Sequence, residues 1–144
     1  MDYAALQEAI RVHFWNGWDA PSQAIVGYEV PVFWDKEPQS VPDVTKGFLR
    51  FTFRFLSEQQ RGIGSCHDGS QYYQGVGLVW IQFFFPESLP DQYCLELAGL
   101  AVSIFRGQRV SVAWFHDVSL KDVQSEDEYK RFDVLAETRY EDRG

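Results

Sequence analysis

The sequence predicts an α+β protein: a single domain, residues 1–144, in which an antiparallel or mixed sheet carries an N-terminal and a central helix on one face. Two patterns support this prediction. Apolar residues recur at helical spacing in two segments, and alternating or continuous apolar runs typical of strands lie between and after them. The longest unit, Tyr72 to Phe105, combines one strand with one amphipathic helix.

The central unit begins with an apolar, β-branched and aromatic run, Tyr72 to Phe85, which favours a long strand. Pro86 ends this strand, since proline cannot donate a hydrogen bond to the ladder. Ser88 with Asp91 three residues later resembles a capping box and predicts the start of a helix. Gly107 suits its C-terminal end. The helix has apolar residues at helical spacing: Tyr93, Leu97, Leu100, Ala101, Ile104 and Phe105.

The N-terminal segment predicts a helix from Tyr3 to Trp15, with Asp2 as its N-cap. Asn16-Gly17 is expected to stop this helix, and Ala20 to Gln23, which contains a proline, is expected to form a turn. The apolar run Ile25 to Trp34 resembles a strand that its proline confines to a sheet edge or a bulge.

Phe48 to Leu56 shows the clearest strand alternation: phenylalanines 51, 53 and 55 face one way, and Arg50, Thr52 and Arg54 face the other. A further strand is expected over Gln108 to His116, with Val110, Val112 and Trp114 on one side. The last strand, Tyr129 to Glu141, places Phe132, Val134, Ala136, Thr138 and Tyr140 on one side. Three polar connections are expected: Asp35 to Lys46, Ser57 to Gln71, and Asp117 to Asp127.

Composition narrows the possible functions. The net charge of -8 and the pI near 4.8 argue against nucleic-acid binding through a broad basic surface, and we expect no sequence-specific nucleic-acid partner. No apolar run is long enough for a membrane span, and no signal peptide is visible, so the protein is expected to be made in a reducing cytoplasm. Cys94 is expected to pack in the central helix, apart from Cys66 in a polar loop.

Reactive residues are few, and we predict no catalytic residue, no cofactor and no metal site. Cys66-His67-Asp68 groups three reactive side chains, but neighbours in an extended segment point to opposite sides. Gly62 to Ser65 lacks the lysine of a phosphate-binding loop. His13 lies on the apolar face of the first helix and is expected to be structural. A small cytoplasmic hydrolase that uses Cys66 or His116 is the enzymatic alternative.

Several residues are candidates for an interface. Arg50 and Arg54 share one strand face and could bind a phosphate or a carboxylate, although a solvated face or a salt bridge between subunits is the simpler interpretation. Three consecutive phenylalanines cannot all face one side of a sheet, so at least one must be covered by a helix, a loop or another chain. The candidate interface residues are Arg50, Arg54, Arg61, His67, Phe83, Phe84 and Phe85.

The run Gly75 to Pro86 resembles a strand of the tail-terminator, or tail-completion, proteins of long-tailed bacteriophages, in which a glycine precedes an apolar strand that ends at a proline turn. The helix segment Leu97 to Phe105, rich in small and apolar residues, and the closing strand Phe132 to Tyr140 are similar to elements of the same family. The N-terminal helix, with aromatic residues at its end, also fits. The order of elements matches over most of the chain, and residues match over about a third.

The resemblance implies a structural protein rather than an enzyme. Family members form a ring, usually a hexamer, at the head-proximal end of the virion tail, where they stop growth of the tail tube and offer a surface to head-completion, or neck, proteins. The expected partners are therefore copies of the chain itself, the tail-tube protein and a neck protein. The acidic charge fits a channel through which DNA slides. A small α+β protein-binding module is the alternative.

Overall fold

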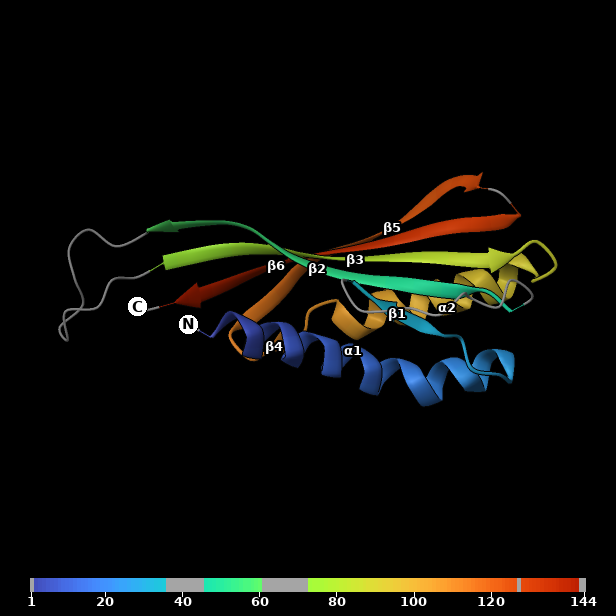
Figure 1. Ribbon diagram of the computed structural model, residues 1–144, viewed down its shortest axis with the longest axis horizontal. Coiled ribbons are helices and arrows are strands. Elements are labelled where there is room, and N and C mark those ends of the chain that lie inside the picture. Colours follow the sequence, from blue (N-terminus) through green and yellow to red (C-terminus); the bar gives the residue numbers. More distant parts are fainter. Residues whose placement is uncertain (1, 36–45, 61–72, 127, 143–144) are drawn as a thin grey trace.

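The computed structural model describes residues 2–35, 46–60, 73–126 and 128–142. These residues form two helices and six strands: α1 (Tyr3–Val26), β1 (Val32–Trp34), β2 (Phe48–Gln60), β3 (Tyr73–Pro86), α2 (Asp91–Phe105), β4 (Arg109–Val110), β5 (Ala113–Glu126) and β6 (Tyr129–Asp142). The strands make one mixed sheet in the order β1-β2-β3-β6-β5-β4, in which only the β1–β2 pair is parallel. Both helices lie on the same side of this twisted, curled sheet, which confirms the predicted α+β class (Figure 1).

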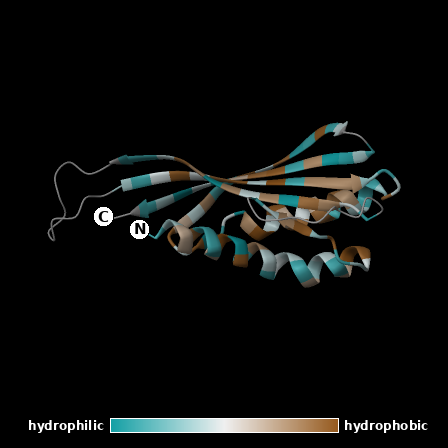
Figure 2. Ribbon diagram, in the orientation of Figure 1, coloured by the Kyte–Doolittle hydropathy of each residue, from teal (hydrophilic) through white to brown (hydrophobic). Residues whose placement is uncertain are grey.

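The core lies between the two helices and the sheet face that they cover, called here the inner face. α1 contributes one row of side chains four residues apart, Leu6, Ile10, Phe14 and Trp18, all buried. Aromatic rings join the layers, since Phe14 stacks on Phe105 of α2 and packs against a phenylalanine of β2. Figure 2 shows the matching alternation of polar and apolar residues along α1 and the strands. No helix within the described ranges is long and apolar enough to cross a membrane.

The predicted end of the first helix at Asn16-Gly17 is wrong, because α1 continues to Val26. Gly17 serves packing rather than termination: a Cβ there would lie 2.9 Å from Cγ1 of Ile104 in α2. The helix therefore also runs through the expected Ala20–Gln23 turn. It ends at Gly27, which has φ +80° and whose N–H donates to Gln23. The predicted N-cap is confirmed, as Asp2 Oδ1 accepts the N–H of Ala5 at 3.0 Å.

Two of the expected polar connections are partly strand. β2 extends through Ser57 to Gln60, and β5 occupies most of the expected Asp117–Asp127 connection. The expected Gln108–His116 strand is instead split at a turn, where Ser111 has φ +55° between β4 and β5. That turn reverses the predicted faces: Val110 is buried, and Val112 and Trp114 are exposed. The rest of the Ser57–Gln71 connection, and residues 36–45 of the other, lie outside the described residues.

The remaining predictions concern the strands β1, β3 and β6 and the two ends of α2. β3 and β6 occupy their expected segments, and the five predicted inward residues of β6 are all buried. The expected Ile25–Trp34 strand is too long, because Ile25 and Val26 end α1; only Val32–Trp34 forms a strand, β1, which lies at the sheet edge as the proline predicted. The predicted capping box is wrong: α2 starts after Pro90 without a side-chain cap, because the Asp91 carboxylate accepts a hydrogen bond from Lys130 Nζ at 2.7 Å instead. Gly107, with φ +70°, follows the helix end as expected.

Candidate interaction surfaces

The first candidate surface is the outer face of the sheet, opposite the helices. Strict alternation along β3 divides the consecutive phenylalanines: Phe83 and Phe85 are 0% and 1% exposed on the inner face, and Phe84 lies on the outer face. The strand pairing then places Phe48 of β2, Phe84 of β3 and Arg131 of β6 in one row across the sheet. This row is the base of the outer cluster, which also includes Arg50, Trp80, Tyr129 and Asp133.

Aromatic rings and arginines stack in the outer cluster. The ring of Phe84 lies parallel to that of Phe48, with centroids 4.6 Å apart, and meets Tyr129 edge-on at 5.8 Å. The guanidinium of Arg131 lies 4.2 Å from the centroid of the Phe84 ring, and that of Arg50 lies 5.6 Å away. Because a guanidinium attracts the negative face of an aromatic ring, these contacts fix Phe84 in place.

An ion pair anchors the outer cluster to the sheet. Arg131 Nη2 lies 2.9 Å from Asp133 Oδ1, and both side chains are largely buried. Arg131 Nε also donates to the carbonyl of Phe83, and Trp80 Nε1 donates to Asp133 Oδ2 at 3.1 Å. Every one of these bonds involves a charged group, so each is stronger than a neutral one. The outer cluster is therefore a rigid surface rather than a set of mobile side chains.

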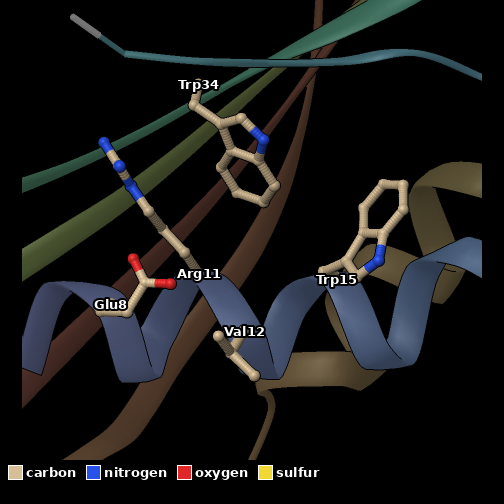
Figure 3. A pocket seen from close by; sticks show the side chains of 5 residues that line it. All are labelled: Glu8, Arg11, Val12, Trp15 and Trp34. Carbon is tan, nitrogen blue, oxygen red and sulfur yellow. The ribbon is translucent and has the colours of Figure 1, made fainter. Parts of the chain in front are cut away.

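The second candidate surface is a hollow between α1 and β1, called here the α1–β1 pocket (Figure 3). It has a volume of about 320 Å³ and is lined by Glu8, Arg11, Val12, Trp15 and Trp34. Arg11 lies at the Trp34 end of the pocket: its guanidinium is 5.9 Å from the tryptophan ring, and Nη2 donates to the carbonyl of Asp35 at 3.1 Å. Two tryptophans, one valine, one carboxylate and one guanidinium thus surround a hollow that is open to solvent.

The third surface lies where the N-terminal end of α1 meets β2 and β6. The carboxylate of Glu58 accepts hydrogen bonds from the hydroxyls of Tyr3, at 2.5 Å, and Tyr140, at 3.1 Å. Tyr140 is buried and lies directly above Gly75 of β3, where a Cβ would come within 2.1 Å of its ring. Phe55 and Leu56 are exposed beside this network. The glycine is required here because the tyrosine ring occupies the space of a side chain.

The structure places the predicted interface residues in different environments. Arg50 and Arg54 are exposed on the outer face, as the alternation predicted, and Phe84 lies half-buried on the same face. Phe83 and Phe85 are core residues that pack under the helices, so in a single chain they present no surface to a partner. Arg61 and His67 lie outside the described residues, as does Cys66. A role for Arg50, Arg54 and Phe84 in an interface stays a prediction.

Sequence reasoning missed most of the outer cluster and the pocket. Trp80, for example, is 37% exposed on the outer face and donates a hydrogen bond to Asp133. Alternation could have placed it there, because Trp80 shares its face with Gln82 and Phe84. Arg131 and Asp133 flank a predicted inward phenylalanine, which assigns both to the outer face. The α1–β1 pocket joins residues of α1 to Trp34, which lies 19 to 26 positions further along the chain, and no local pattern indicates such a contact.

Two of the histidines, Cys94 and Lys130 are titratable residues whose surroundings the structure defines. His13 Nε2 donates to the carbonyl of Ile104 at 2.7 Å, which fits its predicted structural role. His116 lies beside Glu137 at 3.6 Å and beside the ring of Trp114. Burial raises the pKa of the Cys94 thiol, and the hydrogen bond to Asp91 raises the pKa of Lys130. Within the described ranges, no group of three His, Cys, Asp or Glu residues could hold a metal ion.

Comparison with known proteins finds similarity in structure alone. No family model matches the chain, and no curated protein sequence matches it. One solved structure is similar with a TM-score of 0.62 and 15% sequence identity, and the alignment covers 93% of this chain and 94% of that one. A chain in the virion of a native gene transfer agent particle is similar with a TM-score of 0.50 and 15% identity, covering 96% and 98%. At this identity the similarity shows a shared fold.

Proposed function

We propose that this chain is a structural protein of a phage-like virion and that it acts there as a tail terminator. The observation that carries the proposal is the likeness, over nearly the full length of both chains, to a protein in a gene transfer agent virion. The resemblance of Gly75 to Pro86, and of the elements after it, to tail-terminator proteins adds the specific role. Both observations point to assembly rather than to catalysis.

In this role the chain forms a ring, expected to be a hexamer, on the head-proximal end of the tail tube. The physical basis is imitation of a tube subunit: a ring with a similar fold docks on the last tube ring through the contacts that another tube ring would use. Its opposite face carries different residues and offers no site for the next subunit, so tube growth stops. That face then binds a neck protein.

The outer face supplies the docking residues in this proposal. Arg50 and Arg54 project from β2, and the ring of Phe84, held by the outer cluster, lies near the guanidinium groups of Arg50 and Arg131. Arginine and aromatic residues are enriched at the centres of protein interfaces, where they form most of the strong contacts. A surface whose side chains are already fixed loses less conformational entropy when it binds.

The test is electron microscopy of tail-tube subunits, from the particle that carries this chain, polymerised with and without the purified protein. We expect shorter tubes with a ring of extra density at one end. Arg54→Glu should reduce capping, whereas Lys121→Glu makes the same change of charge on a distant strand of the sheet and should have less effect. Unchanged tube lengths and bare tube ends, with the protein folded, would refute the terminator role.

A further inference from the structure

We propose that successive copies of this chain contact each other by inserting an exposed apolar turn of one copy into the α1–β1 pocket of the next. The inference rests on the proposed ring-forming role and deepens it by naming the two contacting surfaces. The turn between β4 and β5 carries Val112, and Trp114 follows it as the second residue of β5; these side chains are 43% and 48% exposed. We call this segment the β4–β5 knob.

The two surfaces belong to opposite edges of one sheet. β1, which carries Trp34 of the pocket, is the first strand of the sheet order, and β4, which begins the knob, is the last. A contact between two different surfaces is heterologous, and it leaves one free knob and one free pocket at the ends of every open chain of copies. Such a chain ends only when it closes into a ring, which is the assembly that the proposed function requires.

The pocket and the knob complement each other in size. The pocket volume of about 320 Å³ lies at the lower limit of the range for small-molecule sites, roughly 300–1,000 Å³, and suits one large side chain. Its walls are Trp15 and Trp34, and Val12 of α1 borders it with 46% exposure. Trp114 can offer an indole to these aromatic walls, because its side chain projects from the outer face and is about half exposed beside the His116 ring.

The charges around the two surfaces also match. Two charged residues line the pocket: Glu8 is exposed at its rim, whereas Arg11 is only partly exposed and its guanidinium is directed at the Trp34 ring and the Asp35 carbonyl. The knob is flanked by arginines: Arg109 is exposed in β4, and Arg139 is exposed on β6 directly opposite Trp114 in the strand pairing. A copy inserted knob-first therefore brings cations toward an acidic rim around an apolar centre, which is the usual arrangement of a binding surface.

Other occupants are less suited to the pocket. A small polar ligand would gain little from two indole walls, and an acidic partner would meet exposed Glu8 at the rim, because the Arg11 guanidinium already contacts the Trp34 ring and the Asp35 carbonyl. A second copy supplies an exposed tryptophan, an exposed valine and flanking arginines together on its β4–β5 knob, at the sheet edge opposite the pocket. Because an aromatic side chain alone buries only about 150–250 Å², the contact is the anchor of a larger interface rather than the whole of it.

The test measures the mass of the protein in solution, by light scattering and sedimentation, for three matched variants. Val12→Asp places a charge in the pocket, Val112→Asp places one on the knob, and Leu95→Asp places one on the exposed surface of α2, away from both sheet edges. We expect an oligomer for the wild type and for Leu95→Asp, and monomers for the other two. Trp114→Ala should weaken self-association about 30-fold, as expected for an interface anchor.

Mixing the two monomeric variants tests the geometry. Val12→Asp keeps an intact knob, and Val112→Asp keeps an intact pocket, so equal amounts should form a one-to-one dimer and nothing larger. The proposal is overturned if either variant keeps the wild-type mass with its fold intact by circular dichroism, if the mixture stays monomeric, or if the wild type is itself monomeric at every concentration. Capping of tail tubes by the wild type is scored separately, so loss of the contact and loss of the terminator role remain distinguishable.

Discussion

Replacement of neighbouring phenylalanines by alanine tests the division of β3 into an inner and an outer face. Phe83 is fully buried, with its ring centroid 5.7 Å from that of Trp18 and 5.2 Å from that of Phe85. Phe83→Ala removes a core ring and leaves a cavity that the aromatic neighbours cannot fill, so it should lower the free energy of unfolding by about 3–5 kcal/mol.

Phe84 should contribute less to stability, although it is the same residue type one position along the strand. Its ring is half-buried, and its two closest ring contacts are the aromatic pair with Phe48 and the cation–π contact with Arg131, which are worth about 1–2 kcal/mol together; the contacts with Tyr129 and Arg50 are longer and weaker. The Arg131–Asp133 ion pair does not involve the ring and should persist. Phe84→Ala should instead weaken the docking that we assign to the outer face.

The assay is urea unfolding followed by circular dichroism and tryptophan fluorescence. With a slope of about 2 kcal/mol per molar urea, Phe83→Ala should lower the midpoint by about 2 M and Phe84→Ala by about 0.5–1 M. Both slopes should match the wild type, since neither change alters the surface exposed on unfolding. Equal midpoint losses, or a larger loss for Phe84→Ala, would show that the assignment of the two faces is wrong.

Three further changes test other contacts. Gly75→Ala should unfold the protein or displace the Tyr140 ring, since the new Cβ would lie within 2.1 Å of it; an unchanged melting temperature would contradict this. Asp133→Ala removes the carboxylate that pairs with the buried Arg131 guanidinium and should lower the free energy of unfolding by about 3–5 kcal/mol in a urea titration, whereas exposed Arg54→Ala should lower it by less than about 0.5 kcal/mol. Burial raises the pKa of the Cys94 thiol, so the native state should stabilise the protonated thiol. This contribution to stability should be fully present below the unfolded-state pKa and should be lost as the pH rises through the folded-state pKa. Peptide mapping after iodoacetamide treatment at pH 8 should therefore show Cys94 labelled only in denaturant.

Much of the fold was predictable because its main elements follow simple periods. The alternation in β2, β3 and β6 identified which residues face the helices, since a strand with one buried face shows its register in the sequence. The errors occurred where a residue plays a tertiary role. Gly17 resembles a helix stop, but it is the point where two helices pack closely. The polar residues of β5 resemble a loop, but pairing with β6 makes them a strand.

The candidate surfaces were less predictable, because each joins residues from distant parts of the chain. Sequence alternation placed Arg50 and Arg54 on the outer face, but it could not show that Phe84 stacks between Phe48 and Arg131. The α1–β1 pocket depends on how α1 crosses the end of β1, which is a matter of packing angle rather than of sequence period. Local patterns therefore predicted the faces of elements, and tertiary packing decided which side chains meet.

The Arg131–Asp133 pair gives the outer face a fixed geometry, which supports the docking role that we propose for this face. Removing two charges from water costs free energy, and their mutual attraction returns little more than that cost, so a buried ion pair adds little net stability. What it does supply is geometry: the pair aligns Trp80 through a hydrogen bond and holds Phe84 under the guanidinium. A fold that needed only stability could place apolar residues there. A surface that must match a partner gains from fixed aromatic rings, because their rotamers are already chosen before binding.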